Sequence, residues 1–174
     1  MGRVIGFYPE KLVLAVLISE PELKQKLLDE LTDSFGSQDY ISQEIEFSFT
    51  RYYCEEMGDR ISRFFLSFQD LVNPERLAEI KIETNYLESH FSREGKRKVN
   101  LDPGLLSLSR FILATTKDSS HRIPLHSGIY AETTLIYERK EFRAVEWTYP
   151  DYRSPEYLKI LHNIRSIYKK QSKS

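Results

Sequence analysis

The sequence predicts an α+β fold, and three observations support this prediction. Residues 12–18 form an uninterrupted apolar run, which is typical of a strand buried on both faces of a sheet. Residues 45–49 alternate between apolar and polar side chains, as in a strand with one buried face. Residues 23–35 instead carry apolar side chains at helical spacing and end before Gly36. Both kinds of element therefore occur in one chain of 174 residues, a length that suits a single core.

The next signals place two helices among the first strands. The first helix is expected to begin near Ser19, because Ser19 stands three residues before Glu22, the spacing of a capping box. The aromatic-rich run 61–68 predicts a further strand. Asn73-Pro74 then starts a second helix, with asparagine as the cap and proline at the first helical position.

Residues 96–101 predict the next strand and complete the order strand, helix, strand, strand, helix, strand. This order is the split βαβ, or ferredoxin-like, arrangement, and it assigns a core to about residues 11–102. The extension 103–170 is expected to open with a helix at Asp102-Pro103-Gly104, which repeats the cap-plus-proline signal. Residues 106–109 also alternate like a strand, so a strand is the alternative there.

The end of the chain predicts a β-hairpin and a helix. Residues 129–137 and 142–147 have the composition of paired strands joined by a short polar turn. Ser154-Pro155 then starts a terminal helix. No linker separates a second domain, so we expect a single domain over residues 1–174.

Composition excludes several classes of protein. The formal net charge is −1 and the pI is near 6.4, whereas proteins that coat nucleic acid are usually strongly basic. Bases outnumber acids over residues 93–143, which suits a pocket-sized cationic face. Cys54 is the single cysteine and fits a reducing compartment, so the cytoplasm is the expected location. The longest apolar run is too short to cross a bilayer, and we expect no membrane partner.

Residues 96–104 contain the first candidate for an anion site. Alternation along a strand would place Lys96 and Lys98 on one face and Arg97 on the other, although charges that protect an edge strand are the alternative. The segment from Asn100 to Gly104 would set free backbone N–H groups at the start of a helix, where anions bind. In the simpler interpretation, Asp102 caps this helix and Gly104 only avoids a steric clash.

Residues 115–122 are the second candidate, a polar segment directly after an apolar one. Lys117, His121 and Arg122 can hold phosphate or carboxylate oxygens, and Asp118 can bind Mg²⁺ or act as a base. An ordinary solvated loop is the alternative.

Glu132 is the third candidate, because a carboxylate in the middle of a predicted strand either faces water or has a chemical role. Alternation places Tyr130, Glu132 and Thr134 on one face. Close to Asp118, Glu132 would complete a magnesium site, since Mg²⁺ prefers one or two carboxylates plus substrate phosphates. Two aromatic loops are less specific. Residues 49–58 can form a lid and residues 147–153 can stack a base or a sugar, but either can also be ordinary loop packing.

These candidates favour the binding of a phosphorylated small molecule, with nucleotides as the first class to consider. The expected ligand-binding residues are Lys96, Asn100, Lys117, Arg122 and Tyr130. The residues expected to act in catalysis are Asp118, His121 and Glu132. Mg²⁺ would be bound by Asp102, Asp118 and Glu132. An RNA-binding module and a regulatory or assembly domain are the alternatives, and neither an enzymatic reaction nor an oligomeric state follows from these residues.

Standard nucleotide and hydrolase motifs do not occur in the chain. There is no G-x-x-x-x-G-K-[ST] phosphate loop, no G-x-G-x-x-G turn, no G-x-S-x-G elbow and no H-E-x-x-H pair. Five segments nevertheless resemble a bacterial family, domain of unknown function 4416: KRKVNLDPG (96–104), LATTKD (113–118), HR (121–122), GIYAE (128–132) and WTYPDY (147–152). The resemblance extends over nearly the whole chain from Lys11. It implies no mechanism beyond the label GTP-binding that some members carry.

Overall fold

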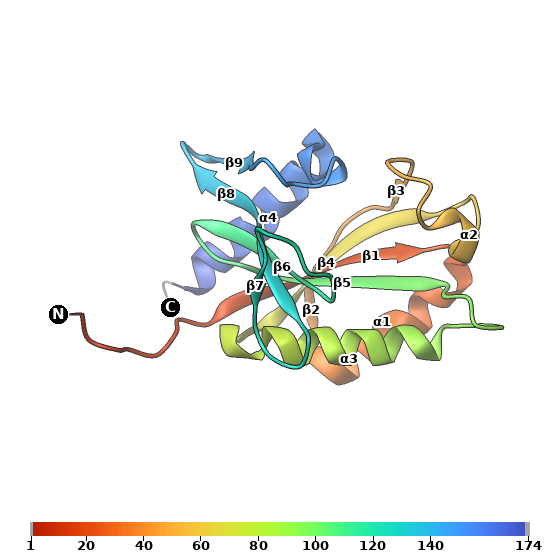
Figure 1. Cartoon of the computed structure of the whole chain (residues 1–174), viewed down its shortest axis with the longest axis horizontal. Helices are drawn as coiled ribbons and strands as arrows, with labels where there is room; N and C mark the ends of the chain where they lie inside the picture. The colour runs from red at the N-terminus through yellow and green to blue at the C-terminus, as the bar shows by residue number, and fades with distance from the viewer. Residues whose placement is uncertain (1, 173–174) are drawn as a thin grey trace.

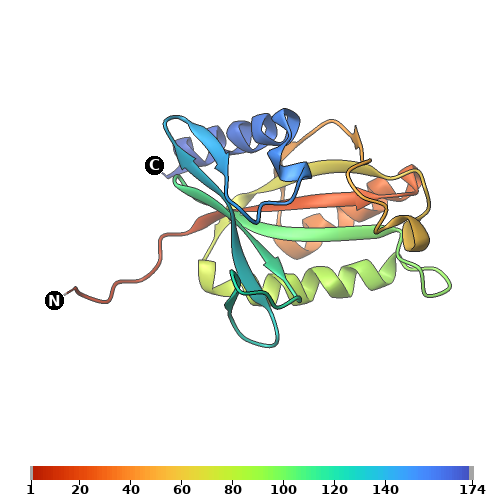
Figure 2. The ribbon, with the colours of Figure 1, turned by 45° about the horizontal axis from the view of Figure 1, so that its top comes forward.

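A nine-stranded sheet with helices on both faces forms the molecule in the computed structural model, which describes residues 2–172. The strand order is β2-β4-β1-β5-β6-β8-β7, with β3 also paired to β4 and β9 to β8, and every paired strand is antiparallel to its neighbour. Helices α1 and α3 cover one face and α4 covers the other (Figures 1 and 2). The predicted α+β class is confirmed.

The bounds of the strands and helices are as follows. The strands are β1 (Glu10–Ile18), β2 (Gln38–Ile41), β3 (Ile45–Glu46), β4 (Ser62–Val72), β5 (Val99–Leu106), β6 (Arg110–Thr115), β7 (Ile123–Pro124), β8 (Tyr130–Glu138) and β9 (Glu141–Ala144). The α-helices are α1 (Lys24–Phe35), α2 (Cys54–Met57), α3 (Leu77–His90) and α4 (Pro155–Gln171). Short 3₁₀ helices precede three of them: η1 (Pro21–Leu23), η2 (Pro74–Arg76) and η3 (Asp151–Arg153). No helix of the described residues is long and apolar enough to cross a bilayer.

Strand β1 is the centre of the sheet, as the apolar run predicts. Its even-numbered side chains, from Leu12 to Ile18, pack with α1 and α3. Val13 and Ala15 face the opposite way, toward the aromatic residues of α4. Both faces of β1 are therefore buried, which explains why the run contains no polar residue.

The sheet divides between β5 and β6. Strand β5 pairs with β1 along all eight of its residues, but it pairs with β6 only through its last three, Gly104–Leu106. At Leu101 the polar backbone groups that a further strand would otherwise satisfy are bonded to side chains of α3. The amide donates to Glu88 Oε1 at 2.7 Å, and the carbonyl accepts from Lys81 Nζ at 2.9 Å. Pro103 lies two residues further along β5, so its backbone faces the same unpaired edge. Because proline has no N–H group, no donor is left unsatisfied where β5 has no neighbouring strand.

The predicted helix at Asp102-Pro103-Gly104 is wrong. The strand that was expected to end at residue 101 begins at Val99 and continues to Leu106, and a second strand, β6, follows it. Gly104 lies where β6 joins β5, and a Cβ atom there would stand 2.7 Å from the Phe111 ring and 2.5 Å from the Ile112 carbonyl oxygen. This glycine therefore allows two strands to approach closely and does not admit an anion at a helix end.

The first helix exists where leucine spacing predicts it, but its predicted cap is wrong. The chain enters α1 through η1 with no side-chain cap, and Ser19 Oγ instead donates to the Lys98 carbonyl at 3.4 Å. The caps of the later helices are confirmed: Asn73 accepts from the Glu75 amide, and Ser154 accepts from the Tyr157 amide. The hairpin of β8 and β9 is confirmed as well. Strand β2 has no counterpart among the predicted elements.

Candidate functional site

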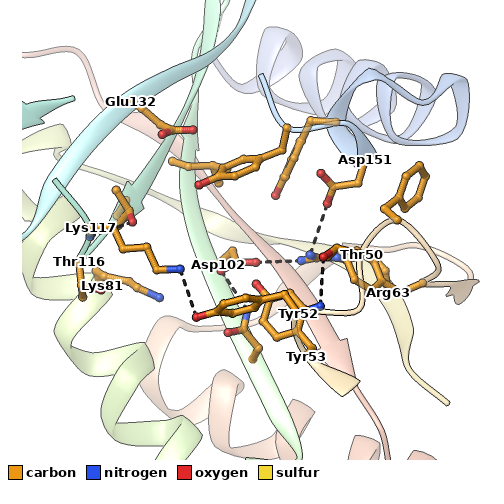
Figure 3. A pocket seen from close by; sticks show the side chains of 18 of the residues that line it. Thr50, Tyr52, Tyr53, Arg63, Lys81, Asp102, Thr116, Lys117, Glu132 and Asp151 are labelled. Atoms are coloured by element: carbon orange, nitrogen blue, oxygen red, sulfur yellow. Dashed lines mark hydrogen bonds and ion pairs between the residues drawn. The ribbon is translucent and has the colours of Figure 1, made fainter. Parts of the chain in front are cut away.

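A cavity of about 810 Å³ lies where β5 and β6 separate. Its walls come from both halves of the sheet, from α3, and from two loops, residues 47–53 and 149–152. Figure 3 shows charged side chains entering it from several of these elements. The volume is within the usual range for small-molecule sites, roughly 300–1,000 Å³.

Arg63 of β4 occupies one side of the cavity between two carboxylates. Its side chain is 2% exposed, and Nη1 donates to Asp102 Oδ2 at 3.0 Å. Nη2 lies 3.6 Å from Asp151 Oδ2, and the guanidinium also stacks over the Phe47 ring at 5.3 Å. Within the described part of the chain, Nε of Arg63 has no hydrogen-bond partner. The dashed lines of Figure 3 mark both ion pairs.

The two carboxylates respond differently to this arginine. Burial alone would raise the pKa of Asp102, but the charges of Arg63 and Lys81 and the hydrogen bonds from Arg63 and Asn100 together lower that pKa. Burial does raise the pKa of Asp151, because the more distant contact with Arg63 only partly offsets desolvation. For Arg63, burial alone would lower the pKa. The negative charges of the facing carboxylates outweigh the effect of burial, and the Arg63 pKa is raised.

Arg97 connects this side of the cavity to α2 and α3. Its Nε and Nη2 donate to the two carboxylate oxygens of Glu56 at 2.7 and 2.8 Å. Nη1 donates to Glu88 Oε2 at 2.8 Å and to Asn100 Oδ1 at 2.9 Å, and Asn100 in turn donates to Asp102 Oδ1. Burial raises the pKa of Glu88 in spite of these donors. A continuous polar network thus extends from Glu56 to Arg63.

Glu132 of β8 lies across the cavity from this network. Oε2 accepts from Arg122 Nε at 2.7 Å and lies 3.3 Å from His121 Nε2. The side chain is 1% exposed, and among the described residues Oε1 has no partner. In Figure 3 the carboxylate points toward the interior of the cavity. Hydrogen bonds to Lys117 O and Tyr149 Oη hold Arg122 in place at 2.8 and 2.7 Å.

A bulge interrupts β8 two residues after Glu132. Leu113 is opposite Glu132 and Phe111 is opposite Leu135, while Ile112 is opposite Thr133, so Thr134 is an extra residue in β8. Because of this extra residue, the predicted common face of Tyr130, Glu132 and Thr134 does not continue along the whole strand.

Lys117 and Tyr52 meet at the exposed side of the cavity. Lys117 Nζ lies 3.3 Å from Tyr52 Oη and 4.5 Å from the centre of its ring. Tyr52 comes from the loop after β3, whereas Lys117 follows β6, so the contact joins the two halves of the sheet. Among residues 2–172, no carboxylate lies within ion-pair distance of this ammonium group.

The structure brings together some of the predicted residues and separates others. Asn100, Asp102, Lys117 and Glu132 line the cavity. His121 and Arg122 reach it through Glu132. Residues with no part in its lining are Lys96 and Asp118, which are exposed, and Tyr130, which is half-buried on β8.

Two predicted groupings are not found. Lys96, Arg97 and Lys98 precede β5, so strand alternation does not distribute them over two faces. Residues 2–172 contain no group of three or more His, Cys, Asp or Glu side chains arranged to hold a metal ion, so Asp102, Asp118 and Glu132 do not form a joint site there.

Sequence reasoning missed Arg63 and Asp151. Arg63 lies inside the predicted strand 61–68, where a lone arginine among aromatic and apolar residues was the available signal. Asp151 belongs to the aromatic loop 147–153, which was considered for its rings only. Residues 49–58, which the sequence suggested as a lid, contribute Tyr52 and Tyr53 to the wall of the cavity.

Comparison with known proteins identifies a family. The search of curated proteins and the search of solved structures each give no match. Residues 8–168 match the family described as Domain of unknown function (DUF4416), and this match includes every residue that lines the cavity. The chain belongs to the DUF4416 family.

Proposed function

We propose that the cavity binds a phosphorylated small molecule of nucleotide size. The observation that carries this proposal is the state of Lys117, a lysine at the exposed side of the cavity whose ammonium group contacts a tyrosine and no carboxylate within the described residues. A phosphate oxygen is a better partner for that group than a phenol, because a hydrogen bond between two charged groups is stronger.

The other cations of the cavity are already compensated. Arg63 faces two carboxylates, and Arg97 binds Glu56 and Glu88. Lys81 lies 4.0 Å from Glu88 Oε1. Among the described residues, Lys117 is thus the cavity cation that lacks a carboxylate partner, which favours a single phosphate group over a triphosphate.

Aromatic and hydroxyl groups around Lys117 fit the rest of such a ligand. Phe49, Tyr52 and Tyr149 present rings against which a base or a sugar can pack. Thr50 and Thr116 line the same side and add hydroxyl groups for phosphate oxygens. Single-stranded RNA is a poorer fit, because the central strands of the sheet are covered on both faces and offer no stacking platform.

In this proposal Mg²⁺ binds only together with the phosphate of the ligand. A phosphate-bound Mg²⁺ needs one or two protein carboxylates, and Asp102 is the partly exposed carboxylate of the cavity. Binding is therefore to be measured with and without Mg²⁺. A reaction of the bound molecule is not part of the proposal.

The test compares two lysine substitutions that remove the same charge. Equilibrium binding of nucleoside monophosphates and sugar phosphates is measured by calorimetry on wild type, Lys117→Ala and Lys96→Ala. We expect Lys117→Ala to weaken binding about 10-fold or more, the effect of losing a hydrogen bond to a charged group. Lys96 is exposed and outside the cavity lining, so Lys96→Ala should bind as wild type does. Failure of wild type to bind any compound, or equal losses in both variants, contradicts the proposal.

We also infer that the first half of the chain is a variant of the ferredoxin-like arrangement. The order β5-β1-β4-β2, with all neighbours antiparallel and with α1 and α3 on one face, supports this inference. The additional strands from β6 onward extend that sheet and create the division where the cavity lies.

A further inference from the structure

Glu132 carries a buried acceptor that residues 2–172 leave without a hydrogen-bond partner. One carboxylate oxygen, Oε2, is bonded to Arg122 and lies near His121, whereas Oε1 has no partner among the described residues. A buried polar atom without a partner costs free energy, and the cost is greater when its group is charged. Because Glu132 lines the cavity, a molecule held there can supply the missing donor.

Arg122 holds the Glu132 carboxylate in place. Arg122 donates Nε to Oε2 at 2.7 Å, and a guanidinium remains charged at all physiological pH values. Burial opposes the charge of Arg122, but the hydrogen bond and the charge of Glu132 outweigh burial and raise the Arg122 pKa. A carboxylate oxygen accepts hydrogen bonds, so an N–H or O–H donor is the partner that Oε1 lacks.

We propose that Glu132 Oε1 accepts a hydrogen bond from the ligand and thereby determines its specificity. This inference rests on the proposed function, because it concerns the same cavity. The ligand then has two distinct ends, namely a phosphate that meets Lys117 and an N–H or O–H donor that meets Glu132. The donor can belong to a base, as an exocyclic amino group, or to a sugar, as a hydroxyl.

The choice of Glu132→Gln as a test follows from this geometry. Arg122 and His121 contact Oε2, and the arginine can only donate, so the atom at this position must be an acceptor. The glutamine amide should therefore turn its oxygen toward Arg122 and its NH₂ group toward the cavity. The substitution converts the free acceptor into a donor with almost no change in volume.

The experiment uses three pairs of ligands that differ by one donor. AMP and purine riboside 5′-monophosphate differ by the 6-amino group, and GMP and IMP differ by the 2-amino group. Ribose 5-phosphate and 2-deoxyribose 5-phosphate differ by a sugar hydroxyl. We expect wild type to prefer the donor-bearing member of one pair by about 10- to 100-fold, and the pair concerned identifies the source of the donor. Glu132→Gln should lose this preference, while both members still bind in a manner that depends on Lys117.

The outcomes separate this inference from the proposed function. Wild type that binds these compounds through Lys117 without a preference in any pair overturns the role of Glu132 and leaves the cavity as a phosphate site. A preference that survives in Glu132→Gln overturns it as well. If Glu132→Gln does not fold, Glu132→Asp keeps the charge but withdraws the oxygen by one methylene group, and it should reduce the same preference. Absence of all binding by wild type contradicts the proposed function itself.

Discussion

At the scale of single residues, Arg63 determines the charge on one side of the cavity. It is the largest of the fully buried side chains, and it holds Asp102 and Asp151 at the wall of the site. Removal of Arg63 would leave these two carboxylates without their cation. The resulting loss in unfolding free energy is larger than the net stabilisation that the ion pairs provide.

Arg63→Met should therefore lower the free energy of unfolding by about 3–5 kcal/mol. Urea denaturation of wild type and Arg63→Met measures the difference. Arg153→Met is the control, because Arg153 donates to backbone carbonyls and forms no ion pair among the described residues. A loss in Arg63→Met no greater than in Arg153→Met would contradict this assignment.

The cost of losing Arg63 should also depend on pH. The folded state lowers the pKa of Asp102 below its ordinary value of 3.8, so the stabilisation is present above that pH and disappears as the pH falls through the lowered value. Arg63 also lowers the pKa of Asp151, although burial raises that pKa by more. The difference in unfolding free energy between wild type and Arg63→Met should be largest near neutral pH and should shrink below about pH 4. A difference that stays constant from pH 7 to pH 3 would exclude this electrostatic origin.

At the scale of elements, β5 shows why a local signal was misleading. Asp102-Pro103-Gly104 has the composition of a helix start, yet each residue has a reason to be in this strand. Asp102 pairs with Arg63, Pro103 needs no amide partner where β6 departs, and Gly104 fits under the Phe111 ring. All three reasons depend on β4 and β6, and sequence spacing carries no information on such contacts.

Gly104→Ala tests the close approach of β5 and β6. Its Cβ would stand within 2.7 Å of a Phe111 ring that is 0% exposed and has little room to move, so we expect a loss of about 1–3 kcal/mol in unfolding free energy. Gly6→Ala is the matched control, because no heavy atom lies within 4 Å of the position where its Cβ would be. Chemical denaturation of both variants measures the effect, and equal stabilities would contradict the packing.

At the scale of the whole molecule, the periodic elements could be predicted and the cavity could be predicted only in part. The central strand, helices α1, α3 and α4, and the C-terminal hairpin depend on local patterns of apolar residues, and the structure confirms them. The cavity depends on contacts between β4, β5, β8 and two loops, so the sequence indicated Asn100, Lys117 and Glu132 but not Arg63. Lys96 and Asp118 show the converse, since their charge suited a site but neither residue lines the cavity.

A ligand in this cavity should stabilise the whole molecule. Binding to the folded state alone at 100 times the dissociation constant adds about 2.7 kcal/mol to the free energy of unfolding. At the same ligand concentration, a 10-fold weaker Lys117→Ala variant should gain only about 1.4 kcal/mol. Urea unfolding with and without the tightest-binding monophosphate measures both gains. Equal gains in wild type and Lys117→Ala would show that the compound binds elsewhere.

The short pairing between β5 and β6 has a mechanical consequence. Three residue pairs connect these strands, whereas β1 and β5 are joined along eight. Three residue pairs restrain the angle between two strands less than eight do. Glu132 and Arg63 lie on opposite sides of this seam, so a bound molecule that touches both would oppose a change in the angle at which β6 leaves β5.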